Sequence, residues 1–255
     1  MSPLHLVLVR LGEPIPTTRA AVGDYSLWFQ RALPGVSCGV VDLRQPDEEL
    51  PRDAGAYLVM GSPAGVWEDL PWLPRAREAA RWLLDSGRPT LGVCFGHQLF
   101  TVARGGEVRR NEAGVEVGTI SVELTPEAAD DPLLRGLPGT LRVNASHDDT
   151  VVRLPAHGPQ DVGPQTPGPQ VLGPQVLGRS ARDQHQVLRW GPRAWSVQFH
   201  PEMRAAETRL AVDWRAPRLL AEGHDPRAVR EAVEDAPHGT ALLARFVELA
   251  REARG

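Results

Sequence analysis

The sequence predicts an α/β fold with a mostly parallel central sheet between layers of helices, followed by a helical C-terminal extension. Three observations predict it. Short, almost wholly apolar runs bounded by glycine and proline occur over residues 4–9, 56–60 and 90–93, as buried parallel strands do. A helical pattern lies between the last two runs, and strand–helix–strand alternation is typical of this class. The segment after residue 202 is helical in pattern.

The first half supplies one well-marked helix, over residues 75–85. Pro74 stands at its start and Gly87 just past its end, which are the preferred positions of these residues. A second helix is expected directly after Gly96. The apolar positions of the first helix recur at helical spacing: Ala76, Ala79, Ala80, Leu83 and Leu84.

The second half changes character. Residues 119–124 alternate between apolar and polar, as a half-buried strand does, and 141–145, 186–190 and 194–199 are further predicted strands. Asp225-Pro226 indicates a helix start, and Thr240 is predicted to cap a last helix. Its predicted inner face holds Leu242, Leu243, Phe246, Val247 and Ala250.

No segment has the composition of a linker between domains, so one domain is expected over residues 1–255. Its catalytic core would span about 4–202 and its helical extension 203–255. A Gly-Pro-Gln triplet starts at Gly158 and recurs every five residues, at Gly163, Gly168 and Gly173. This low-complexity segment is expected to form a mobile surface loop over 158–178; the alternative is a lid or a docking loop.

Composition excludes several function classes. The net charge of −4 argues against nucleic acid as the main partner. The 28 basic residues are all arginine, and the absence of lysine excludes lysine Schiff-base chemistry and a P-loop. Two cysteines cannot make a disulfide framework, so a cytoplasmic location is expected. No apolar run is long enough for a membrane span, and no metal or other cofactor is expected.

Gly92-Val93-Cys94-Phe95-Gly96 has the form Gly-x-Cys-x-Gly between a predicted strand and a predicted helix. This is the context of a nucleophile elbow, with cysteine in place of serine. A tight turn of this kind leaves no room for side chains two positions either side of the nucleophile, and the helix dipole favours a thiolate at its N-terminus. The alternative is a packed cysteine without a role, the reading given to Cys38.

A cysteine nucleophile needs a histidine, which in turn needs a group to orient it. His200, in Phe199-His200-Pro201-Glu202, ends a predicted strand, and Glu202 lies close enough to contact its imidazole. We therefore predict Cys94, His200 and Glu202 as a catalytic triad.

These motifs resemble those of the class I glutamine amidotransferases. The resemblance covers residues 92–99 and 197–202, Met60-Gly61-Ser62-Pro63 where that family has its oxyanion loop, and 146–151, which is similar to its Ser-His-x-Asp-x-Val segment. It extends from about residue 4 to 202 and is strongest to the stand-alone, GMP-synthase-like branch. It implies a three-layer, flavodoxin-like fold. No ATP-pyrophosphatase motif accompanies it.

The resemblance also implies roles. Cys94 would attack a γ-glutamyl amide to form a thioester, with the amides of Ser62 and Phe95, beside Gly61, holding the oxyanion. Gln98 and the segment of Ser146, His147 and Asp148 would bind the α-amino and α-carboxylate groups. His97 is expected to pack on its helix away from the thiol, and His147 to be structural.

Three functions are compatible with this reading. The first is a free-standing hydrolase of glutamine or another small γ-glutamyl compound, which releases glutamate and ammonia or an amine. The second is a glutaminase subunit that delivers ammonia to a separate synthetase. The third is a non-catalytic binding protein of the same fold. A related family of cysteine-elbow proteases lacks the His-Pro-Glu segment. No nucleic acid or membrane partner is expected.

Overall fold

A nine-stranded sheet forms the centre of the protein, in a computed structural model that describes residues 4–156 and 173–253. The strand order is β2-β1-β3-β4-β11-β10-β9-β6-β7. The neighbours from β2 to β11 run parallel and the rest antiparallel. The strands are β1 (His5–Arg10), β2 (Ser37–Asp42), β3 (Ala56–Val59), β4 (Thr90–Val93), β6 (Glu116–Leu124), β7 (Thr140–His147), β9 (Gln175–Arg179), β10 (Val187–Gly191) and β11 (Ala194–Val197). A separate pair joins β5 (Glu107–Arg110) to β8 (Asp149–Arg153).

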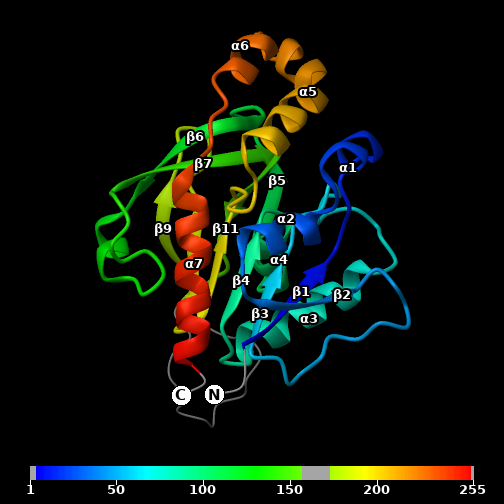
Figure 1. The fold of residues 1–255 in the computed structure, drawn as a ribbon, viewed down its shortest axis with the longest axis vertical. Coiled ribbons are helices and arrows are strands. Elements are labelled where there is room, and N and C mark those ends of the chain that lie inside the picture. Colours follow the sequence, from blue (N-terminus) through cyan, green and yellow to red (C-terminus); the bar gives the residue numbers. More distant parts are fainter. Residues whose placement is uncertain (1–3, 157–172, 254–255) are drawn as a thin grey trace.

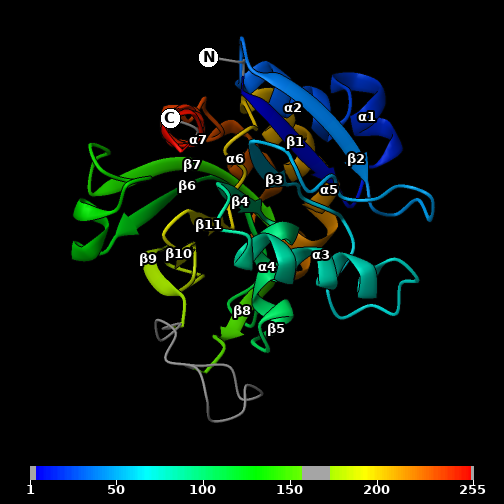
Figure 2. The same ribbon diagram turned by 90° about the horizontal axis from the view of Figure 1, so that it is seen from below.

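Helices cover both faces of the sheet, as Figures 1 and 2 show. α2 and α7 lie on one face, and α3 and α4 lie on the other. α5 and α6 pack beyond the end of β6 and complete the helical C-terminal extension. The helices are α1 (Pro16–Val22), α2 (Tyr25–Ala32), α3 (Leu73–Asp85), α4 (Phe95–Ala103), α5 (Ala205–Ala221), α6 (Pro226–Glu231) and α7 (Pro237–Glu252), with a 3₁₀ turn over Pro126–Asp130.

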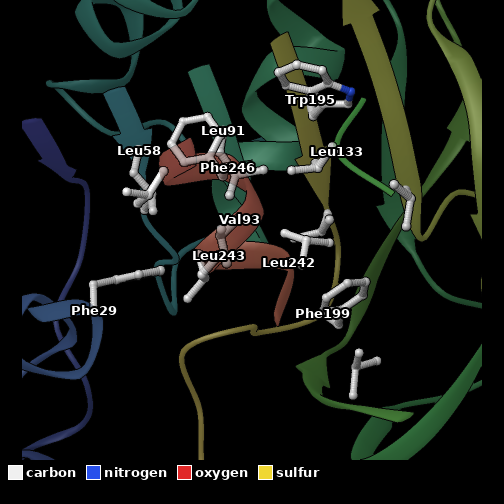
Figure 3. Close-up of a cluster of buried hydrophobic side chains, with 14 of the residues drawn as sticks. Phe29, Leu58, Leu91, Val93, Leu133, Trp195, Phe199, Leu242, Leu243 and Phe246 are labelled. Atoms are coloured by element: carbon white, nitrogen blue, oxygen red, sulfur yellow. The ribbon is translucent and has the colours of Figure 1, made fainter. Parts of the chain in front are cut away.

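The two faces have separate cores because successive strand residues point to opposite sides. In β1, Leu6 and Leu8 join the cluster that includes Phe29 and Phe246, whereas Val7 and Val9 join the cluster on the α3 and α4 side. Figure 3 shows the first cluster, with Leu242, Leu243 and Phe246 of α7 facing the strand residues Leu58, Leu91 and Val93. Because β1, β3, β4 and β11 run parallel, their carboxyl ends lie at the same edge of the sheet.

The structure confirms the predicted three-layer, mostly parallel α/β fold with C-terminal helices. The predicted strand over 90–93 and the end of the predicted helix at Asp85 agree with β4 and α3. Asp225 caps α6 through a hydrogen bond from the Arg227 amide, as Asp225-Pro226 predicted. The division into a single domain with a core over 4–202 stays a prediction.

Two expectations were wrong. α7 begins at Pro237, three residues before the predicted cap at Thr240, because proline occupies the first turn and Ala236 is the N-cap. The end of the low-complexity segment, from Gln175 to Gly178, belongs to β9, which pairs with β10 and β6. The segment over 157–172 lies outside the described residues. Within the described part of the chain, no helix combines the length and apolarity of a membrane span.

Candidate active site

Cys94 occupies a strained turn between β4 and α4. Its φ is 51° and its ψ is −101°, and it is the one non-glycine residue with positive φ in the described parts of the chain. A Cβ on Gly96 would collide with the carbonyl oxygen of Val59, and one on Gly92 would lie 2.9 Å from the Gly96 carbonyl carbon. Only glycine therefore fits at both positions, which is the physical reason for the Gly-x-Cys-x-Gly pattern.

His200 is held next to Cys94 by the strand that precedes it. β11 ends at Val197, and the backbone amide of His200 then donates to the Asn144 carbonyl at 2.8 Å. The imidazole Nδ1 lies 2.7 Å from Glu202 Oε1, and both side chains are buried. A Cβ on Gly61 would lie 3.1 Å from His200 Cε1 and 3.8 Å from Cys94 Cβ. The structure therefore brings the three predicted triad residues together.

Charge within this group favours a thiolate beside an imidazolium. Burial alone would raise the pKa of Cys94, but the positive charges of His200, His147 and Arg215 outweigh it and lower the pKa. Burial likewise opposes protonation of His200, yet the carboxylate of Glu202 and the Cys94 thiolate raise its pKa to about 10. A thiolate beside an imidazolium is the charge state that a cysteine nucleophile requires.

The predicted oxyanion loop lies at the carboxyl end of β3. Gly61 faces the Cys94–His200 pair, and Ser62 lines the same cavity as both residues. The Ser62 hydroxyl accepts from the Ala64 amide at 3.2 Å, which tightens the loop. Phe95, the first residue of α4, places its amide at a helix N-terminus immediately after the thiol. Gly61, Ser62 and Phe95 thus lie near Cys94, and their role as an oxyanion hole stays a prediction.

A cavity of about 60 Å³ opens at Cys94 and His200. One wall comes from the segment between β1 and the middle of α2, and another from α5. Besides Cys94 and His200, its lining consists of Pro14, Ile15, Thr18, Tyr25, Trp28, Ser62, Pro63, Ser146, Met203, Glu207, Ala211, Trp214 and Arg215. The wall is largely apolar and aromatic, with a few polar groups that converge near the thiol, the usual make-up of a small-molecule site.

Arg215 joins the polar end of this cavity to the Ser146 segment. Its Nε donates to Ser146 Oγ at 2.8 Å, its Nη2 to the Ser146 carbonyl at 3.3 Å, and its Nη1 to a carboxylate oxygen of Asp148. Arg110 also pairs with Asp148, at 3.2 Å. The buried Asp148 Oδ1 has no hydrogen-bond partner among the residues the structure describes.

Gln98 and His147, two other predicted substrate residues, lie behind the cavity. Gln98 Nε2 donates to the Asp149 carbonyl and to Gln198 Oε1, both at 3.1 Å. The His147 ring is buried against Glu116 and the Asp149 carbonyl. Ser146 lines the cavity, whereas Gln98, His147 and Asp148 do not.

His97 points away from the thiol, as predicted. Its Nδ1 lies 2.8 Å from Ser196 Oγ, and burial lowers its pKa to about 3, so the ring is neutral.

Sequence reasoning assigned no role to Tyr25 or Arg215. Tyr25 is half-buried at the cavity, where burial and the negative charges of Cys94 and Glu202 raise the pKa of its hydroxyl. It is therefore a neutral donor. Gly23-Asp24-Tyr25 contributes to the resemblance to the GMP-synthase-like branch, whereas Arg215 belongs to no local motif. The packing of α2 and α5 over the site brings both side chains there. Within residues 4–156 and 173–253, no cluster of His, Cys, Asp or Glu is placed to hold a metal ion.

Residues 29–212 match the sequence profile of the family described as "Glutamine amidotransferase class-I". The chain is 39% identical over 157 residues to a GMP synthase [glutamine-hydrolyzing] of Aeropyrum pernix, a match that covers 62% of this chain and 26% of that protein. It is 33% identical over 122 residues to gamma-glutamyl peptidase 3 of Arabidopsis thaliana, covering 46% of this chain and 48% of the peptidase. The matches thus span about a quarter of the synthase and half of the peptidase.

Solved structures agree in fold. A glutamine amidotransferase from Thermotoga maritima superposes with a TM-score of 0.70 at 21% identity, covering 99% of this chain and all of the other. A putative GMP synthase subunit from Thermoplasma acidophilum gives 0.63 at 19% identity, covering 100% and 97%. Because the family profile matches well over half of its residues, this chain belongs to the class I glutamine amidotransferase family.

Proposed function

We propose that the protein hydrolyses γ-glutamyl amides through a thioester on Cys94, as a free-standing enzyme. The observation that carries the proposal is the placement of Cys94 on a strained elbow, against an imidazole whose far nitrogen is bound by Glu202 at 2.7 Å. Such a chain of nucleophile, base and orienting carboxylate is the arrangement that acyl transfer by cysteine needs.

In the proposed first step, the Cys94 thiolate attacks the γ-carboxamide carbon and the carbonyl π electrons move to oxygen. The backbone amides of Ser62 and Phe95 hold the resulting oxyanion, a contribution of about 3 kcal/mol per donor in comparable sites. The imidazolium of His200 then gives its proton to the leaving nitrogen as the C–N bond breaks. Ammonia or an amine departs and a γ-glutamyl thioester remains.

The same geometry serves the second step. The pKa of His200 is raised partly by the Cys94 thiolate, and that negative charge disappears when the thioester forms. The neutral imidazole then acts as general base for a water molecule, whose hydroxide attacks the thioester carbon. Glutamate leaves, and the proton held on His200 restores the imidazolium beside a regenerated thiolate.

The polar end of the cavity suits the α-carboxylate group of the glutamyl unit. In the proposal, Asp148 lies outside the cavity and orients Arg215, with which its carboxylate is paired. The Arg215 guanidinium, one tenth exposed and fixed on the same segment, attracts the α-carboxylate. Gln98 supports this segment through its bond to the Asp149 carbonyl.

A second candidate is a glutaminase that supplies ammonia to a separate synthetase. It is favoured by the relatives named GMP synthase, including one GMP synthase subunit of Methanoculleus marisnigri that is 33% identical over 120 residues. The free hydrolase is favoured by the cavity wall. The cavity residues between Pro14 and Trp28, together with Trp214 and Arg215, already cover the thiol without a partner chain, and Cys94 is 6% exposed.

Glutamate release by the purified protein alone tests the proposal, with glutamine and a panel of γ-glutamyl peptides and amines as substrates. Cys94→Ala should abolish release, and Cys38→Ser, which alters a half-buried thiol on the edge strand β2, should leave it unchanged. Turnover that needs an added synthetase would favour the second candidate. Turnover that survives in Cys94→Ala would refute both.

A further inference from the structure

A buried polar cluster lies behind the Ser146–Asp149 segment, outside the proposed triad. Glu116, at the start of β6, is 4% exposed, and its carboxylate has three neighbours. His147 Nε2 lies 2.9 Å from Oε2, Gln186 Nε2 donates to Oε2 at 2.5 Å, and Ser180 Oγ donates to Oε1 at 2.7 Å. A buried carboxylate is costly unless it is paired and hydrogen-bonded in this way. We therefore ask what role this buried carboxylate has besides packing.

The partners of His147 fix its protonation state. Nε2 faces the Glu116 carboxylate, and Nδ1 lies 3.0 Å from the backbone carbonyl of Asp149. With Glu116 ionised, both partners accept hydrogen bonds and neither donates, so both ring nitrogens carry a proton. The ring is then an imidazolium, in agreement with the raised pKa that, against burial, the Glu116 carboxylate gives it. The carbonyl of Asp149 also accepts from Gln98 Nε2 at 3.1 Å, so this one oxygen joins the histidine to α4.

We propose that Glu116 is a positioning residue for the active site: by holding His147 as an imidazolium, it fixes the Ser146–Asp149 segment against Gln98 and keeps a second positive charge beside Cys94. The inference rests on Cys94 being the nucleophile. The charge on His147 lowers the pKa of Cys94, and the thiolate in turn raises that of His147, against its burial. The carboxylate thus acts on the thiol through one intervening ring.

His97 provides an internal contrast. It is as fully buried as His147 and lies on α4 itself. Its partner, however, is the Ser196 hydroxyl, which can donate or accept, and its Nε2 has no partner among the described residues. Without a carboxylate the ring stays neutral. Burial alone therefore does not make a buried histidine cationic in this protein; the carboxylate of Glu116 does.

Glu116→Gln tests the proposal, because glutamine keeps the shape of the side chain and removes its charge. The rate at which iodoacetamide alkylates Cys94 is measured against pH in a Cys38→Ser background, where Cys94 is the only thiol. We expect alkylation about tenfold slower near pH 6 in Glu116→Gln, together with a raised KM. Glu123→Gln, an exposed carboxylate on the same strand, is the matched control and should behave as wild type.

Three further variants separate positioning from a merely structural role. Glu116→Asp retains the charge and should retain the alkylation profile. His147→Gln should reproduce the slowing seen in Glu116→Gln, and the double variant should be no slower than either, because the two residues act as a unit.

A lowered Tm with an unchanged alkylation profile in both single variants would overturn the proposal, as would additive effects in the double variant. Because alkylation reports only on the surroundings of Cys94, this outcome is distinct from a failure of wild-type protein to release glutamate, which would count against the proposed function.

Discussion

Replacement of Glu202 by glutamine should remove the charge that keeps His200 protonated while leaving the shape of the site intact. Glu202 is 4% exposed, its Oε1 lies 2.7 Å from His200 Nδ1, and its Oε2 has no hydrogen-bond partner among the described residues. Its hydrogen bond is therefore made to the imidazole of His200. A hydrogen bond to a charged group contributes about 1.5–3 kcal/mol, which is equivalent to lowering the pKa of His200 by about one to two pH units from about 10.

The same free energy predicts a loss of about 10- to 100-fold in kcat/KM for glutamate release. The dependence of kcat/KM on pH is the sharper test of this role. The thiolate of Cys94, with its lowered pKa, is lost as pH falls through that pKa, whereas the imidazolium of His200 is lost as pH rises through about 10. Wild type should therefore lose activity on the alkaline side near pH 10, and in Glu202→Gln this loss should begin at lower pH.

The assay is kcat/KM against pH on the best substrate of the γ-glutamyl panel, with circular dichroism to verify folding. Glu207→Gln is an informative control: this carboxylate is also buried and lines the cavity, but it pairs with Arg31 and Arg204 rather than with His200. In Glu207→Gln, the loss of kcat/KM at alkaline pH should occur at the same pH as in wild type. An alkaline limb in Glu202→Gln that coincides with that of wild type would refute the assignment of Glu202 as the group that orients and charges His200.

Two further substitutions test the elbow and the cavity wall. Gly96→Ala places a Cβ against the Val59 carbonyl oxygen and should cost about 1–3 kcal/mol of stability with loss of glutamate release. The control is Gly139→Ala, where an added Cβ would meet open space, and it should change neither thermal unfolding nor activity. Equal Tm values for the two variants would contradict the steric argument. Arg215→Gln should raise KM about tenfold or more with a smaller effect on kcat, because a charged hydrogen bond to the substrate is lost. The control is Arg218→Gln, which alters another arginine of α5, one that pairs with Glu222. An unchanged KM in Arg215→Gln would refute the role of Arg215.

The parts of the site that the sequence predicted are those whose geometry is local. The two glycines around Cys94 are required by atoms of the same turn and of the adjacent β3. Their spacing therefore indicates the elbow from a single sequence. His200 and Glu202 are two residues apart and meet directly. Buried parallel strands such as β4 are apolar throughout, so their pattern is also readable in isolation.

The parts that were missed depend on packing between distant segments. β2, which holds Cys38, is an edge strand with an exposed side, so it shows no continuous apolar run. β9 lies within the Gly-Pro-Gln repeat, and its pairing with β10 and β6 outweighs the loop-like composition. Arg215 lies in the interior of α5, where an arginine normally faces solvent, and only contact with Ser146 and Asp148 gives it a place at the site.

The cavity lining divides into residues around the thiol and walls that come from other segments. In the proposed function, Cys94, His200 and Ser62 supply the elements of acyl transfer. The walls include residues 14–28 and 214–215. Because chemistry at the thiol is the same for ammonia and for a larger amine, we expect these walls to contribute to the choice between them. Exchange of residues 14–28 between relatives should therefore change which γ-glutamyl compounds are cleaved while leaving the pH dependence of Cys94 alkylation in place.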